Sequence, residues 1–210
     1  MGLEKLIRQR IYKEKPITIK SILEMLLLVY VVLLVVLLYF VMFISVLVVV
    51  KGQSMENSLH NNELVLINRF SKNPKMNDIV VLKNPNTDIE IIKRVVALSG
   101  DTIVFKAEDS FVKLWRKSGN GVLKEIEETF IKERMLLSFF ERVDVTINID
   151  EERTIEQGFI FVMGDNRNDS LDSRIFGQVA KNDIRGIQYT LLKKDSALEW
   201  LFIIIYRPKF

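Results

Sequence analysis

Residues 25–50 read MLLLVYVVLLVVLLYFVMFISVLVVV, without a charged residue, a glycine or a proline. About 20 apolar residues are enough to span a bilayer as a helix, and a buried helix with no polar face would be unusual in so small a protein. A cleaved signal peptide fits poorly, because the run is too long and no small-residue cleavage site follows it. The stretch therefore predicts a transmembrane helix over residues 25–45, and the β-branched residues from Val46 to Val50 predict a first strand.

The segment before this stretch is basic. Residues 1–24 contain Lys5, Arg8, Arg10, Lys13, Lys15 and Lys20. Because cytoplasmic flanks of membrane helices are enriched in Lys and Arg, we expect a single-pass protein of the plasma membrane with its N-terminus in the cytoplasm. The chain then divides into a cytoplasmic basic segment (1–24), the transmembrane helix (25–45) and an extracytoplasmic domain (46–210).

Composition excludes several kinds of chemistry. The chain of 210 residues has no cysteine and one histidine, His60. Thiol catalysis, thiolate metal sites and sites built on several histidines are therefore excluded. The net charge of +3, from 30 basic and 27 acidic residues, does not indicate nucleic-acid binding. We predict no nucleic-acid partner, no metal and no cofactor.

The remainder of the chain alternates short strand-like runs with Asn- and Pro-containing turns. The predicted strands are residues 63–68, 78–82, 89–98, 102–105, 144–149, 159–163 and 187–192. Strands this short and closely spaced predict a mainly β domain of antiparallel sheet.

Two segments depart from this strand pattern. Residues 106–157 are rich in charge and are predicted to form an insertion or small subdomain, with a helix over 123–142. The apolar tail, residues 198–206, is too short to span a bilayer. It is predicted to be a closing strand rather than a membrane contact.

Two of the candidate functional residues are a serine and a lysine. Ser54 lies in Gly52-Gln53-Ser54-Met55, just after the first predicted strand. A serine hydroxyl is a poor nucleophile unless a base takes its proton, so Ser54 alone reads as a turn residue. Lys93 lies on a predicted strand and shares a face with Ile91, Val95 and Ala97. Burial on such a face lowers the pKa of a lysine toward that of a usable base, whereas an edge lysine reaching water is the simpler alternative.

The third candidate segment is residues 164–174, GDNRNDSLDSR, which follows a strand-like run. It fits a hydrogen-bonding network that holds a catalytic lysine, or an ordinary polar turn. A calcium loop fits poorly, because Arg167 stands where an oxygen ligand is needed and the turn glycine is missing. A pair between Ser54 and His60 is also disfavoured, since His60 reads as an exposed loop residue.

In this order after an apolar helix, the three segments resemble the type I signal peptidases, serine–lysine endopeptidases that remove signal peptides from exported proteins. The family motif G-x-S-M-x-P-T-L corresponds to residues 52–59, and K-R-V-x-x-x-P-G-D corresponds to residues 93–101. The motif G-D-N-R-x-x-S-x-D-S-R-x-x-G is matched at every fixed position by residues 164–177. Asn57-Ser58 replaces Pro-Thr and Ser99 replaces a proline, departures that bear on substrate preference. The single anchor and the short spacing between motifs are similar to the compact Gram-positive forms.

The resemblance implies a role for each matching residue. Ser54 would attack the scissile carbonyl, neutral Lys93 would take its proton, and Ser170 would hydrogen-bond the lysine amine and orient it.

Supporting roles are implied for the rest of the third motif and for the turn around the serine. Asp172 and Arg174 would form an ion pair, and Asp165 would shape the same loop. The Ser54 backbone N–H would stabilise the oxyanion. The Gly52 region lacks the hydroxyl that supplies a second donor in some relatives.

The resemblance thus implies a membrane-bound serine endopeptidase, with residues 46–210 as its catalytic domain beside the lipid surface. Its partners would be signal-peptide-bearing preproteins, bound by strand addition at a sheet edge, and membrane lipid. The alternatives are processing of a narrow client such as a pilus subunit, and a non-catalytic, chaperone-like homologue in pilus assembly. The presence of Ser54 and Lys93 argues against the non-catalytic homologue. A self-cleaving repressor-type protease is disfavoured by the anchor and by the lack of a DNA-binding helical domain.

Overall fold

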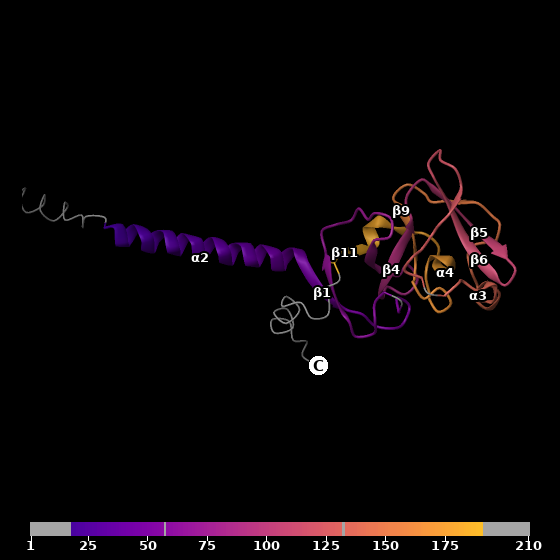
Figure 1. Cartoon of the computed structure of the whole chain (residues 1–210), viewed down its shortest axis with the longest axis horizontal. Helices are drawn as coiled ribbons and strands as arrows, with labels where there is room; N and C mark the ends of the chain where they lie inside the picture. The colour runs from indigo at the N-terminus through magenta and orange to yellow at the C-terminus, as the bar shows by residue number, and fades with distance from the viewer. Residues whose placement is uncertain (1–17, 57, 132, 191–210) are drawn as a thin grey trace, which may run out of the picture. The chain divides into compact units, whose positions relative to one another are not determined.

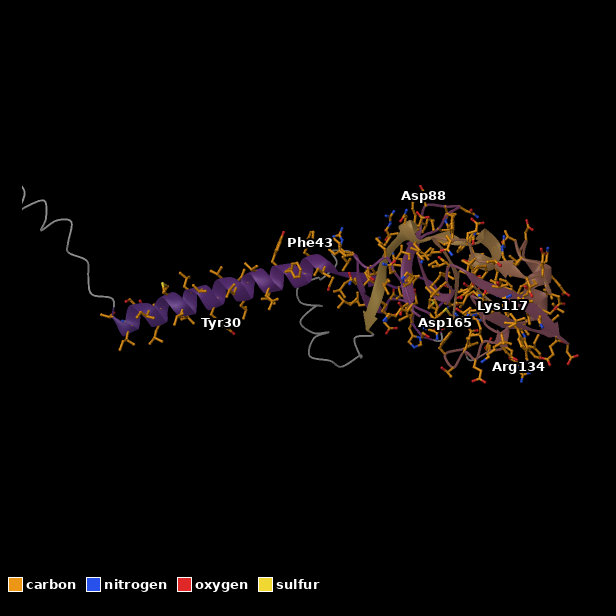
Figure 2. The ribbon with its side chains drawn as sticks, turned by 90° about the horizontal axis from the view of Figure 1, so that it is seen from above. Tyr30, Phe43, Asp88, Lys117, Arg134 and Asp165 are labelled. Carbon is orange, nitrogen blue, oxygen red and sulfur yellow. The ribbon has the colours of Figure 1, made fainter. Side chains whose placement is uncertain are left out.

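A computed structural model describes residues 18–56, 58–131 and 133–190 of the chain, which divides into two compact units at residues 43 and 44. Helix α2 (Ile19–Ile44) is, among the described residues, the one helix long and apolar enough to cross a membrane. Its side chains project on every side and are exposed, Tyr30 among them (Figure 2). An apolar helix with no polar face is stable in lipid rather than in water.

Helix α2 begins earlier than the predicted residue 25. Thr18 explains this start, because its Oγ1 accepts a hydrogen bond from the backbone N–H of Ser21 at 3.3 Å, as an N-cap threonine does. The first turns after this cap carry Lys20 and Glu24, which are four residues apart on one face of the helix. The helix ends at Ile44, one residue before the predicted end.

The second unit is built on a seven-stranded sheet (Figure 1). In spatial order its strands are β1 (Ser45–Val49), β2 (Leu64–Asn68), β11 (Ile184–Thr190), β3 (Ile79–Lys83), β4 (Glu90–Ala97), β9 (Phe159–Met163) and β10 (Val179–Ala180). Each of these neighbouring pairs is antiparallel. The structure therefore confirms the prediction of a mainly β, antiparallel fold with one N-terminal apolar helix.

Most of a smaller four-stranded sheet lies within the predicted subdomain, residues 106–157. Its order is β7 (Lys124–Glu125), β6 (Phe111–Ser118), β5 (Asp101–Glu108) and β8 (Arg153–Thr154). The β5–β6 hairpin lies beside the short helix α3 (Leu137–Arg142) in Figure 1. Phe105, Phe139 and Phe140 pack with Phe161 of β9 in one core cluster, so this sheet shares its core with the large sheet.

Two sequence predictions in this subdomain are wrong. The helix predicted over 123–142 is limited to α3, because the chain before it bonds to the edge of β6: Ile126 N–H donates to Leu114 O and Val112 N–H donates to Met135 O. Tertiary pairing thus overrides a high helix propensity. Residues 144–149 form no strand. The apolar tail at 198–206 lies outside the described residues.

The large sheet brings the three candidate segments together. Strand β4 lies between β3 and β9, and the loop holding residues 164–172 follows β9 directly. The pairing of β4 with β9 shifts register between Val95 and Ala97. Because of this bulge, Ile91 and Val95 pack in one core cluster and Ala97 packs in another. The predicted common face of Lys93 therefore includes Ile91 and Val95 but not Ala97.

Candidate active site

Ser54 lies in a turn that follows β1, and contacts before and after Ser54 hold this turn in place. Gly52 has a φ of 91°, a conformation that glycine adopts without strain, and its N–H donates to Asn61 Oδ1 at 3.0 Å. After Ser54, the side chains of Met55 and Leu59 are buried in the cluster that also holds β2 residues. The turn thus holds a half-buried hydroxyl in a fixed place.

Lys93 reaches this hydroxyl from β4. Its Nζ lies 2.6 Å from Ser54 Oγ, and the lysine is only 3% exposed. Burial lowers the pKa of Lys93 from 10.5 to about 8, with Asp172 opposing this shift and Arg174 adding to it. A buried amine is costly to charge, so the site supplies, within reach of a serine hydroxyl, an amine that becomes neutral as the pH rises through about 8.

The loop after β9 contains a fully buried ion pair. Arg174 Nε donates to Asp172 Oδ1 at 2.8 Å, and its second terminal nitrogen donates to Asp172 Oδ2 at 2.7 Å. Asp172 also caps helix α4 (Ser173–Phe176) and accepts a hydrogen bond from Gly164 N–H at 3.0 Å. Burial alone would raise the pKa of Asp172, but the Arg174 charge and these hydrogen bonds hold it below its ordinary value. Asp172 therefore keeps its negative charge near the amine.

A second buried ion pair was not predicted from the sequence. Asp165, inside the β unit (Figure 2), accepts hydrogen bonds from Arg94 Nε at 2.8 Å and from an Arg94 terminal nitrogen at 2.7 Å. Arg94 also donates to Asn77 O and to Ser58 Oγ. Both partners lie in motifs already identified in the sequence, since Arg94 directly follows Lys93 and Asp165 belongs to the third motif. Asp165 therefore joins the loop to β4 and to the Ser54 turn.

Ser170 lies at the site without the predicted bond. Its buried Oγ has no hydrogen-bond partner among the described residues, so the bond to the Lys93 amine is not formed in this structure. The amine contacts Ser54 Oγ instead. Gly164 explains how closely these groups approach, because a Cβ at Gly164 would overlap both Ser170 Oγ and the Ser54 carbonyl oxygen.

The predicted oxyanion site comprises the Ser54 backbone N–H and the Gly52 region. The Ser54 N–H donates to no described residue, and the Ser54 carbonyl accepts from Asn166 N–H at 3.0 Å. The Gly52 N–H is already bonded to Asn61, so it is not available as a donor. His60 is exposed and contacts Glu56 Oε1 at 3.2 Å rather than Ser54. Within the described ranges, no group of three or more acidic or histidine side chains could hold a metal.

Sequence reasoning also missed Glu128, Phe130 and Arg167. Arg167 is buried and forms a two-pronged ion pair with Glu128, while the Phe130 ring lies 3.9 Å from the Arg94 guanidinium carbon. Arg167 belongs to the third motif, but nothing in residues 106–157 marks its partners. Chemically, the whole arrangement offers a hydroxyl, an adjacent amine of lowered pKa and a backbone donor. Acyl transfer needs these three groups.

Comparisons with known proteins match most of the chain to one protein family. The family model described as "Signal peptidase, peptidase S26" matches residues 22–191. "Signal peptidase I P" of Bacillus subtilis subsp. natto is 34% identical over 144 residues, which are 67% of this chain and 72% of that protein. "Signal peptidase I" of Bacillus caldolyticus is 32% identical over 143 residues, 66% of this chain and 74% of that protein. The crystal structure of a signal peptidase I from Enterococcus faecalis V583 has 27% identity and a TM-score of 0.35, covering 55% of this chain and 96% of the other.

Proposed function

The chain belongs to the signal peptidase family, peptidase S26, and we propose on that premise that it removes signal peptides by a Ser54–Lys93 dyad as a membrane-anchored enzyme. Its relatives are named signal peptidase I, a class of serine endopeptidase. The observation that carries the dyad is the 2.6 Å separation between Lys93 Nζ and Ser54 Oγ.

In the proposed mechanism, neutral Lys93 takes the Ser54 proton as Oγ attacks the carbonyl before the cut. The Ser54 N–H donates to the oxyanion that develops. The protonated lysine then gives its proton to the leaving amine, which is the new N-terminus of the mature protein. Lys93 next takes a proton from a water molecule as its oxygen attacks the ester. It returns this proton to Ser54 Oγ as the Oγ–acyl bond breaks, which releases the signal peptide and restores the serine hydroxyl and the neutral amine.

Membrane attachment is part of the proposal. Helix α2 supplies a span of sufficient length, and a membrane anchor would confine the enzyme to the surface where preproteins emerge. The N-inside orientation remains a prediction from the basic residues of 1–24. Labelling from outside intact cells would test it, using a single cysteine introduced at Asn86, which lies in the exposed turn after β3.

The function is tested with detergent-solubilised protein and a preprotein that has small residues one and three positions before its cleavage site. We expect a single cut after the small residue, located by mass spectrometry, and no cut when both small residues are replaced with Leu. Cutting that ignores these residues, or no cutting of a panel of preproteins that includes pilus subunits, would contradict the proposed function.

The pH dependence of kcat/KM is expected to follow Lys93. The base has to be neutral and burial lowers its pKa to about 8, so kcat/KM should rise with pH through about 8 and then level off. The midpoint in kcat/KM reports the free enzyme. Measurement from about pH 6 to pH 10 would show this limb and its plateau. A kcat/KM that is still rising at pH 10, as expected for a lysine with the ordinary pKa of 10.5, would argue against a buried base.

A further inference from the structure

Residues 128–136, here called the strap, connect β7 to α3 and contain no regular helix or ladder strand where the structure describes them. The strap lies against the loop that comes after β9. The side-chain amide of Asn168, in that loop, makes two hydrogen bonds to the strap. Its Nδ2 donates to Arg134 O at 3.0 Å, and its Oδ1 accepts from Leu136 N–H at 2.8 Å. Arg134 lies at the surface of the unit (Figure 2), so this part of the strap lies on the outer side of the loop.

The strap sends one acidic side chain inward. Glu128 binds the Arg167 guanidinium with both carboxylate oxygens, and the two side chains are 8% and 1% exposed. Arg167 in turn donates from Nε to the Gly164 carbonyl at 3.0 Å. A buried guanidinium without its carboxylate is strongly destabilised, so Glu128 determines whether Arg167 can remain in this position.

Gly164 is the point where this chain of contacts reaches the serine and the lysine. Its Cα lies so close to the Ser54 carbonyl and to Ser170 Oγ that no side chain fits. Its N–H is held by Asp172, a residue that interacts electrostatically with Lys93. A shift of Gly164 would therefore move Ser54 relative to Lys93.

The strap makes a second contact with the site through Phe130. Its ring covers the Arg94 guanidinium at 3.9 Å, and Arg94 binds Asp165 and Ser58. A cleft of about 630 Å³ lies between the strap and β6 residues such as Val112 and Leu114, and the Glu128–Arg167 pair lines it. At its end the strap is fixed to β6 by the hydrogen bond from Val112 N–H to Met135 O, and near its start it is held by the inward contacts of Glu128 and Phe130.

We propose that Glu128 is a positioning residue for the cleavage reaction, acting through Arg167 and the Gly164 carbonyl on the Ser54–Lys93 geometry. The proposal rests on the proposed function, in which these two residues cut the preprotein. It also gives residues 106–157 a role: the small sheet presents the strap to the loop after β9. Glu128 does not touch the reacting groups, so its effect should appear in kcat rather than in substrate affinity.

The test uses the full-length protein with Glu128→Gln, which keeps one acceptor for Arg167, and Glu128→Leu, which keeps the size but no acceptor. Because small misplacements of reacting groups cost up to about 100-fold in rate, we expect kcat to fall about 10-fold for Gln and about 100-fold for Leu. KM should stay within about 2-fold, as for loss of an interaction specific to the transition state. Glu127→Gln, on the exposed neighbour, is the matched control and should leave both constants unchanged.

Amide hydrogen exchange supplies a readout that does not need activity. The Asn166 N–H is held by the Ser54 carbonyl, and we expect faster exchange over residues 164–170 in both Glu128 variants but not in Glu127→Gln. Unchanged kcat with unchanged exchange would overturn the proposal, as would a loss of thermal stability with kcat per folded molecule unaltered. If the wild type cleaves no preprotein, the proposed function fails, and the exchange experiment still decides whether Glu128 holds this loop.

Discussion

Preprotein cleavage is expected to fall at least about 10⁴-fold in kcat when Ser54 is replaced with alanine, as for loss of the nucleophile in other serine proteases. The variant retains the turn, the Gly52–Asn61 hydrogen bond and the buried Met55 and Leu59 anchors, but has no oxygen to attack the carbonyl. Lys93 would then have only a water molecule to activate in place of the serine hydroxyl. The rate should be followed by mass spectrometry over long incubations.

The folded state should survive this change. Among the described residues Ser54 Oγ has one hydrogen bond, to Lys93, and losing one such bond changes the free energy of unfolding by about 1 kcal/mol. Ser118→Ala, on an exposed serine at the end of β6, is the matched control and should cleave at the wild-type rate. Cleavage by Ser54→Ala within 10-fold of wild type, a limit far inside the expected loss, would show that another group is the nucleophile.

A trapped intermediate gives a second view of the same step. With a substrate whose ester is hydrolysed slowly, the wild type should carry the added mass of the signal-peptide fragment on the peptide that contains Ser54. Ser54→Ala should carry none. An added mass on a different peptide would identify the true nucleophile directly.

The sequence predicted the fold well where the pattern is local. The apolar run, the strand-like runs at residues 63–68 and 78–82, and the turn clusters each depend on a few neighbouring residues, and the corresponding helix and strands are present. The helix predicted over 123–142 is wrong because its high propensity competes with backbone hydrogen bonds to β6. Those bonds join residues distant in sequence, so no local window contains them.

For the candidate site too, residues within local motifs were predicted, whereas contacts between distant segments were not. The motifs placed Ser54, Lys93, Asp172 and Arg174 in the sequence, and the structure brings these four side chains together. The contact between the Glu128 and Arg167 side chains spans 39 positions of the chain and has no motif on the strap side. The absent Ser170 bond also lay beyond the sequence, since motif order cannot fix which of two hydroxyls the amine contacts.

Replacing Lys93 with methionine is expected to lower kcat by about 10³-fold, within the range for loss of a general base. Methionine has a similar length and no titratable group, so it should fill the same buried space beside Ser54. Lys124→Met, on an exposed lysine of β7, is the control and should retain full activity. A Lys93→Met enzyme with more than about a tenth of wild-type activity would contradict a base role, since even weak general bases contribute about 100-fold.

The same variant should be more stable than the wild type at neutral pH. Lys93 has a pKa of about 8 when folded and an ordinary value of 10.5, so below pH 8 the unfolded chain holds this proton more tightly than the folded one. The difference corresponds to about 3 kcal/mol of destabilisation at pH 7. Methionine removes this penalty but also loses the hydrogen bond to Ser54, which costs about 1 kcal/mol. The free energy of unfolding should therefore increase by about 2 kcal/mol.

The pH dependence of this gain is the sharpest check on the buried amine. Between pH 8 and pH 10.5 the folded wild type is neutral at Lys93 while the unfolded chain still binds the proton, so wild-type stability rises through this window. The advantage of Lys93→Met should therefore shrink from about pH 8 upward. It should reverse at about pH 10, where the remaining charging penalty falls below the ~1 kcal/mol of the hydrogen bond to Ser54. Denaturant midpoints of both proteins in the same detergent, measured across this range, would show the crossing. Parallel curves would mean that Lys93 has the same proton affinity folded and unfolded, which is incompatible with a base made available by burial.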